Sequence, residues 1–121
     1  MPIKILVCDD HESIRDSVKL ILNDSGYELY FACDGHETLE QVKNLKPEII
    51  LLDIKMPKLS GLDALGQIKA LSPESKIIMV SGYGQSEVME KALSRGADNY
   101  LVKSFSGKEL KDIIQTTLNK A

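Results

Sequence analysis

The stretch EIILLDIKMP, residues 48–57, decides how the rest of the chain is interpreted. Four apolar residues, Ile49 to Leu52, run directly into Asp53, and a run that apolar is typical of a strand buried on both faces. An ionised carboxylate is costly to bury without partners. We therefore expect this strand to end at the rim of a sheet, where Asp53 faces a ligand.

Short apolar runs alternate with segments of helical periodicity along the chain. The other predicted strands span residues 3–8, 27–32, 76–80 and 99–102. Apolar residues recur at helical spacing in five segments, marked by Ile14, Val18, Ile21 and Leu22; by Leu39, Val42 and Leu45; by Leu62, Leu65 and Ile68; by Val88, Ala92 and Leu93; and by Leu110, Ile113, Ile114 and Leu118. We expect Ser13 or a neighbour to cap the first helix and Gly26 to end it.

This alternation predicts an α/β fold, in which a five-stranded parallel sheet is covered by five helices on its two faces. The strands at 3–8, 49–53 and 76–80 are apolar and should be central, whereas the alternating strand at 27–32 should lie at an edge. Right-handed crossovers then favour the strand order 2-1-3-4-5. In such doubly wound sheets a ligand binds at the carboxyl ends of the strands, near the switch point between the first and third strands.

The composition excludes several classes of protein. The chain has 121 residues, which suits a single domain spanning residues 1–121. Its formal net charge of −3 argues against binding to nucleic acid, and no apolar stretch is long enough for a signal peptide or a membrane span. Cys8 and Cys33 are too few for a disulfide framework, so we expect a cytoplasmic protein with two structural thiols; a redox pair is the alternative.

Polar and charged residues follow four of the five predicted strands. They are Asp9 and Asp10, Asp53, Ser81 and Gly82, and Lys103. Because the carboxyl ends of parallel strands share one rim, we expect these residues to meet there. Their convergence is the main argument for a functional site.

Three carboxylates in one crevice repel each other and need a cation. Two unit charges 4 Å apart cost about 4 kcal/mol at an effective dielectric constant near 20. Oxygen ligands with open positions suit Mg²⁺, or Mn²⁺, better than Zn²⁺. Neither His11 nor His36 has metal-ligand spacing to a partner, and we interpret both as solvated loop residues, His11 with a chance of modulating the acids.

An ammonium group and a hydroxyl group complete a cradle for a phosphoryl group. Lys103 would supply the first and Ser81 the second. Asp53 could then attack phosphorus as a nucleophile, as carboxylates do in aspartyl-phosphate enzymes. The alternatives are an ion pair for Lys103 and a helix cap for Ser81.

At this point the sequence resembles the receiver (CheY-like) domain of bacterial two-component response regulators. The resemblance rests on CDD at 8–10, LLDIKMP at 51–57 followed by Gly61, VSGYG at 80–84 and ADNYLVKSF at 97–105. Their order and spacing match this family over essentially the whole chain. The resemblance implies the flavodoxin-like form of the fold and a signalling switch that catalyses only its own phosphorylation and dephosphorylation.

The resemblance also implies roles for individual residues. Asp53 would accept a phosphoryl group from a sensor histidine kinase or a histidine phosphotransfer protein. Asp10, Asp53 and the backbone carbonyl of Lys55 would ligate Mg²⁺, with Asp9 acting through water. Ser81, Gly82, Lys103 and the backbone of Lys55 would contact the phosphoryl group.

A surface made of the fourth helix, the fifth strand and the fifth helix would then signal to a downstream protein or output domain. Tyr100 falls at the family's switch aromatic, and its alternative is an ordinary residue of an edge strand. The short apolar stripe of the fourth helix suggests a moving element, or simply a short surface helix. The protein would act as a monomer or as a phosphorylation-dependent dimer.

One position departs from the family pattern, because Ser104 replaces the proline that usually follows the lysine after a cis bond. A cis bond costs about 3–4 kcal/mol before a non-proline residue, so we expect Lys103–Ser104 to be trans. We also expect a shifted or mobile loop, with Lys103 less well placed. Lys55 could either hinder an attacking water or attract the phosphoryl group.

Two other functions are open to a chain of this pattern. The first is a pseudo-receiver that is never phosphorylated, although such proteins usually lose an acid or the lysine. The second is a Mg²⁺-dependent phosphohydrolase or nuclease, although the Asp-x-Asp pair expected of such enzymes is missing at both acidic sites, DDH at 9–11 and DIK at 53–55.

Overall fold

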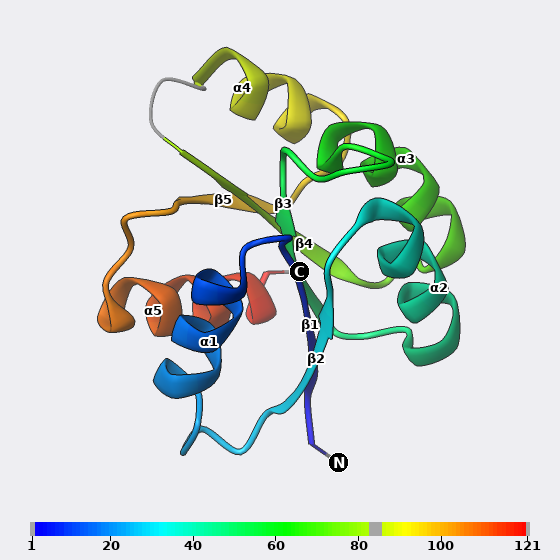
Figure 1. The fold of residues 1–121 in the computed structure, drawn as a ribbon. Coiled ribbons are helices and arrows are strands. Elements are labelled where there is room, and N and C mark those ends of the chain that lie inside the picture. Colours follow the sequence, from blue (N-terminus) through cyan, green and yellow to red (C-terminus); the bar gives the residue numbers. More distant parts are fainter. Residues whose placement is uncertain (1, 83–85, 121) are drawn as a thin grey trace.

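The computed structural model describes residues 2–82 and 86–120, in which strands and helices alternate (Figure 1). The strands are β1 (Lys4–Cys8), β2 (Glu28–Ala32), β3 (Ile49–Asp53), β4 (Lys76–Ser81) and β5 (Asn99–Val102). The helices are α1 (Glu12–Ile21), α2 (Gly35–Leu45), α3 (Gly61–Leu71), α4 (Ser86–Ser94) and α5 (Gly107–Leu118). Of the motif at 80–84, Tyr83 and Gly84 lie outside the described residues.

The five strands form one parallel sheet in the order β2-β1-β3-β4-β5. Every residue of β3 is buried, whereas β2 is mostly half-buried. The apolar strands are therefore central and β2 lies at an edge, which confirms the fold class and the strand order predicted from the sequence.

Helices cover both faces of this sheet (Figure 1). A separate hydrophobic core lies between the sheet and the helices on each face. Helices α2, α3 and α4 bury one core, to which they contribute Val42, Leu65, Ile68, Met89 and Ala92. Helices α1 and α5 bury the other, to which they contribute Val18, Leu110 and Ile114. None of the helices in the described segments is long and apolar enough to cross a bilayer.

The limits of α1 differ from the prediction at both ends. The N-cap is His11 rather than Ser13, because the His11 carbonyl already accepts the amide protons of Ile14 and Arg15. The helix ends at Ile21, well before Gly26. Gly26 instead has φ +81° in the turn that leads to β2, a conformation in which glycine carries no steric penalty.

Candidate functional site

The strand register brings the predicted site residues to one rim. Asp53 ends β3 and pairs with Val80, while Ser81 ends β4 and pairs with Val102. The ladder continues one residue further, because the Lys103 amide donates to the Ser81 carbonyl at 2.7 Å. Residues that are far apart in the sequence therefore share the carboxyl end of the sheet.

Three carboxylates and one imidazole crowd together at this rim. One ligand atom from each of Asp9, Asp10, His11 and Asp53 lies within 4.8 Å of the others. The side chains of Asp9 and Asp53 are only 3% exposed, whereas that of Asp10 is 34% exposed. We call the three carboxylates, Asp9, Asp10 and Asp53, the acid cluster.

Lys103 is the ammonium group that faces the acid cluster. Its Nζ lies 3.0 Å from Asp53 Oδ2 and 3.4 Å from Asp9 Oδ2. Burial alone would lower the pKa of Lys103, but the hydrogen bond to Asp53 and the two negative charges outweigh it, so the pKa lies above its ordinary value. Lys103 therefore stays protonated and neutralises part of the cluster.

The peptide bond after this lysine tests the expectation drawn from Ser104. No cis peptide bond occurs in the described segments, so the Lys103–Ser104 bond is trans as predicted. Lys103 is nevertheless not displaced from the site, since it reaches Asp53 at hydrogen-bond distance. The long side chain places the ammonium group, which corrects the expectation of a poorly placed lysine.

Asp53 combines burial with a crowded electrostatic environment. Burial raises its pKa, the hydrogen bond from Lys103 lowers it and the charge of Asp9 raises it, and the net shift is upward. The Lys55 amide also donates to Asp53 Oδ1 at 3.3 Å. A carboxylate held this way at a rim, with one cationic partner, can serve as a nucleophile.

The loop after Asp53 requires glycine at one position. The Gly61 amide donates to the Ile54 carbonyl at 2.8 Å, and a Cβ at Gly61 would overlap the carbonyl oxygen of Asp53. This close approach folds the β3–α3 loop back against the end of β3. Gly61 belongs to the motif that follows Asp53, but its spacing alone does not reveal this contact.

Two residues at the start of α1 also contact the rim. The side chain of His11 is 57% exposed, as expected of a solvated residue, but its Nδ1 lies 2.9 Å from Asp9 Oδ1 and 3.3 Å from Asp10 Oδ1, which is the contact with the acids that a modulator would need. Arg15 Nη1 donates to the Asp9 carbonyl at 2.7 Å. A long basic residue one turn after an acidic pair was the available signal for Arg15. His36, by contrast, is exposed, although it lies in α2 rather than in a loop.

Ser81, Gly82 and Tyr100 lie at or near the same end of the sheet. Ser81 is buried, and its hydroxyl donates to the Gly82 carbonyl at 3.2 Å rather than to Asp53. Tyr100 projects from edge strand β5 and is 47% exposed. The roles of Ser81 and Gly82 as phosphoryl contacts and of Tyr100 as a switch residue stay predictions.

The two cysteines differ in environment. Both are free, with Cys8 buried in β1 and Cys33 exposed just after β2. Burial raises the pKa of the Cys8 thiol to about 12, which disfavours the thiolate needed for disulfide exchange. Cys8 therefore has the properties of a structural residue.

The charges and donor atoms of the rim fit a divalent cation. Three carboxylates outnumber the two cationic groups beside them, the Lys103 ammonium and the Arg15 guanidinium at the Asp9 carbonyl, so negative charge is in excess. Carboxylate oxygens in a partly open cluster are the ligands that Mg²⁺ prefers, and it keeps several waters. The residues present are thus suited to a hydrated oxygen-bound ion.

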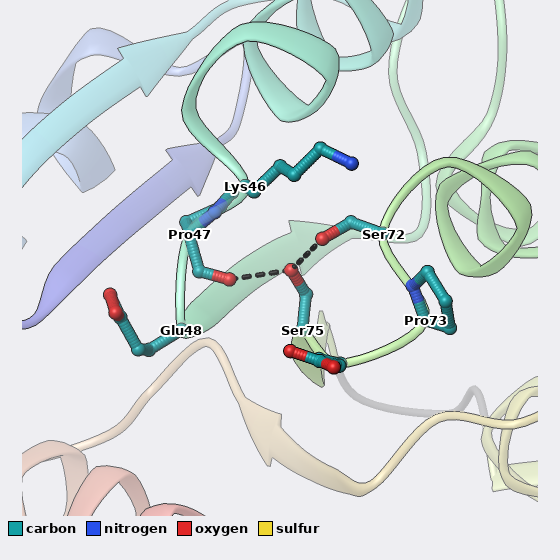
Figure 2. A pocket seen from close by; sticks show the side chains of 7 residues that line it. Lys46, Pro47, Glu48, Ser72, Pro73 and Ser75 are labelled. Atoms are coloured by element: carbon teal, nitrogen blue, oxygen red, sulfur yellow. Dashed lines mark hydrogen bonds between the residues drawn. The ribbon is translucent and has the colours of Figure 1, made fainter.

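The opposite end of the sheet has a hollow of a different kind (Figure 2). This hollow has a volume of about 420 Å³ and is lined by Lys46, Pro47, Glu48, Ser72, Pro73, Glu74 and Ser75. Its buried hydroxyls have partners, since Ser75 Oγ donates to the Pro47 carbonyl and lies 2.7 Å from Ser72 Oγ. These bonds tie the loop before β3 to the loop before β4, which is a structural role.

Comparisons with known proteins show the family of this chain. Residues 5–115 match the model of the response regulator receiver domain family. The chain belongs to this family. It is therefore a phosphoacceptor signalling domain of the two-component type.

Individual relatives include short and long proteins. Chemotaxis protein CheY of Listeria monocytogenes is 35% identical over 114 residues, which are 93% of this chain and 96% of that protein. Response regulator MprA of a Mycobacterium species is 34% identical, over 91% of this chain but only 48% of its own length. The crystal structure of a CheY-like receiver domain protein from Methanospirillum hungatei has a TM-score of 0.92 and 35% identity, and the match covers 98% of this chain and 95% of that one.

Proposed function

We propose that Asp53 is the residue that receives the phosphoryl group, from a phosphohistidine on a sensor histidine kinase or a histidine phosphotransfer protein. The observation that carries this proposal is the buried Asp53 carboxylate 3.0 Å from the Lys103 ammonium group, inside the acid cluster. Of the three acids, Asp53 is the one at the end of a strand buried along its whole length.

The transfer is an in-line displacement at phosphorus. An oxygen of Asp53 forms a new O–P bond while the P–N bond to the donor imidazole breaks, and the leaving imidazole keeps the electron pair and takes up a proton. Lys103 stabilises negative charge on the transferred oxygens. Ser81, Gly82 and the Lys55 amide are proposed as further donors to the phosphoryl group.

The same rim would hold the metal that such a transfer requires. We propose that Asp10, Asp53 and the backbone carbonyl of Lys55 ligate Mg²⁺, or Mn²⁺, with Asp9 acting through a bound water. The ion, when bound, supplies positive charge to the transferring oxygens. Lys55 stays a candidate for altering how fast water reaches the phosphoryl group.

The outcome of phosphorylation would be a change of surface. We propose that α4, β5 and α5 report the state of Asp53 to a downstream protein or output domain, with Tyr100 turning inward. The 47% exposure of Tyr100 supports this, because the side chain lies at the surface, from which an inward turn would start. The protein would work as one domain in the cytoplasm, as a monomer or a phosphorylation-dependent dimer, without itself binding nucleic acid.

Acetyl phosphate, a small phosphoryl donor, tests the proposal. The protein is incubated with this donor and Mg²⁺, and its intact mass is compared with that of Asp53→Asn and of an EDTA-treated sample. One added phosphoryl group in the wild type alone supports the proposal. No adduct in any sample favours a pseudo-receiver, and steady phosphate release from Asp53→Asn favours a phosphohydrolase.

A further inference from the structure

The ring of His11 is turned into the acid cluster, although histidine has no place in the proposed ligand set. His11 is the N-cap of α1, yet its side chain makes no capping hydrogen bond. Its Nδ1 instead lies 2.9 Å from Asp9 Oδ1, 3.3 Å from Asp10 Oδ1 and 3.2 Å from Lys103 Nζ. One ring atom therefore faces both carboxylates of the acid pair and an ammonium group.

No tautomer of the imidazole satisfies all of these neighbours. An ammonium group can only donate, so toward Lys103 the Nδ1 atom must present a lone pair. An ionised carboxylate can only accept, so toward Asp9 and Asp10 the same atom must carry a proton. A cation bound by Nδ1 and Asp10 removes this conflict, because both then present a lone pair to it. Asp9 then acts through a bound water, and Lys103 keeps its contacts with Asp53 and Asp9.

The spacing of these atoms suits shared coordination. Two neighbouring ligands on an octahedral ion with bonds of 2.0–2.1 Å are about 2.8–3.0 Å apart. Nδ1 lies 3.3 Å from Asp10 Oδ1, so a small movement of either side chain brings the two atoms to that separation.

The backbone around His11 holds this arrangement in place. The His11 amide donates to Asp9 Oδ1 at 2.9 Å, and Arg15 Nη1 holds the Asp9 carbonyl. The His11 carbonyl is fixed by the first turn of α1. The imidazole is thus carried on a tethered segment next to the carboxylates.

We propose that His11 Nδ1 is a nitrogen ligand of the divalent-ion site and sets its metal selectivity. The inference rests on the proposed ion site at Asp10 and Asp53. Imidazole binds the later first-row ions well, whereas Mg²⁺ prefers oxygen. His11 therefore shifts the preference of the rim from Mg²⁺ toward ions such as Co²⁺, which fit the same octahedral geometry.

Calorimetric titration of the whole chain with Co²⁺ and with Mg²⁺ tests this proposal. His11→Phe keeps an aromatic ring but removes the nitrogen, and His36→Phe makes the same change at an exposed histidine of α2. We expect His11→Phe to lose at least about tenfold in Co²⁺ affinity, the scale on which even indirect partners of a metal matter. Its Mg²⁺ affinity, and both affinities of His36→Phe, should stay at the wild-type values.

Electron spin echo spectroscopy separates direct ligation from a structural effect. Its main measurement uses the wild type and therefore does not depend on whether the variant folds. In the Mn²⁺ complex, electron spin echo modulation detects a directly bound ¹⁴N nucleus. Labelling the two histidines of the wild type with ¹⁵N should change that modulation, and His11→Phe should abolish it.

The possible failures of this proposal are distinguishable. An unchanged ratio of Co²⁺ to Mg²⁺ affinity in His11→Phe, without nitrogen modulation in the wild type, would overturn the role of His11. In that case, weaker binding of both ions to Asp10→Asn would still support the proposed ion site at Asp10 and Asp53. Absence of ion binding to the wild type would overturn both proposals.

Discussion

Two partly buried lysines, one at each end of the sheet, show what distinguishes a site from a structural bridge. Lys103, at the carboxyl end, is 22% exposed and faces two of the three carboxylates of the acid cluster. Lys69, at the amino end, is 26% exposed and contacts Asp98 and the Ser75 carbonyl at 3.2 Å each. Their burial is similar, but their charge environments are not.

At the amino end the charge of Lys69 has one partner of opposite sign. Asp98 pairs with Lys69 and also accepts the Ile77 amide proton at 2.8 Å, so one carboxylate meets one ammonium group. At the carboxyl end three carboxylates face the ammonium group of Lys103, with the Arg15 guanidinium at the Asp9 carbonyl, so negative charge is in excess. The local balance of charge, rather than burial, therefore marks the functional end of this sheet.

Replacing each lysine by methionine is the most direct test of the difference between Lys103 and Lys69. Each variant should lose about 1–3 kcal/mol of stability, between the values for exposed and buried ion pairs. Lys103→Met should also be phosphorylated about 100-fold more slowly by acetyl phosphate, because it lacks the ammonium group that stabilises charge on the transferred oxygens. Lys69→Met should keep the wild-type rate. Equal rates in the two variants, measured by intact mass against time, would contradict the assignment of the site.

Two glycines of α3 test whether the backbone beneath Asp53 is as constrained as it looks. Gly61→Ala should cost about 1–3 kcal/mol, the usual penalty for overpacking, and more if the Asp53 carbonyl cannot shift. Gly66 has open space around its Cβ position, so Gly66→Ala should stabilise the helix by about 0.5–1 kcal/mol. Urea denaturation measures both. A neutral Gly61→Ala variant would show that the loop is not tightly packed on Asp53.

The hydroxyl network at the amino end should matter for stability alone. Ser75→Ala removes the donor to the Pro47 carbonyl and the partner of Ser72, at a cost of about 1–2 kcal/mol for unsatisfied buried groups. Ser94→Ala, at an exposed serine of α4, should change stability by less than about 0.5 kcal/mol. Phosphorylation of folded Ser75→Ala at the wild-type rate is expected, and a slower rate would mean that the two ends are coupled.

The smallest effect is the dependence of stability on pH, measured in EDTA. The pKa of Asp53 is raised above its ordinary value of 3.8, so its stabilising contribution is complete below that value and is lost as pH rises through the raised pKa. Asp53→Asn should therefore gain in stability over the wild type as pH increases through this window.

A second aspartate supplies the control of opposite sign. The Glu37 amide lowers the pKa of Asp34, the N-cap of α2, so Asp34 stabilises the fold above its ordinary pKa and less as pH falls. Asp34→Asn should therefore lose stability relative to the wild type as pH rises. If the two variants followed the same pH trend, the electrostatic account of the rim would be wrong.

The fold could be predicted from the sequence because the apolar residues that set the periodicity are the ones buried in the structure. The uniform apolar runs at β1, β3 and β4 indicated central strands, and the carboxyl ends of those strands located Asp9, Asp53 and Ser81. These features depend on the period of the side chains, which can be read from a single chain.

Features that depend on the path of the backbone could not be predicted in the same way. The contact of Gly61 with Asp53 and the rotation of His11 into the acids arise from loop conformation. The cap of α1 was expected at Ser13 or a neighbour because serine is a frequent N-cap, whereas the helix already begins after His11, two residues before Ser13. The reach of Lys103 was underestimated because its long side chain brings the ammonium group to Asp53 although the Lys103–Ser104 bond is trans.

The most direct test of the central claim locates the phosphoryl group on the chain. Borohydride reduces an acyl phosphate to the alcohol, which converts a phosphorylated aspartate to homoserine, and tryptic peptide mass mapping then finds the modified residue. After treatment with acetyl phosphate and Mg²⁺, we expect homoserine at Asp53 and unchanged Asp9 and Asp10. Homoserine at either residue of the acid pair, or none at Asp53, would contradict the account.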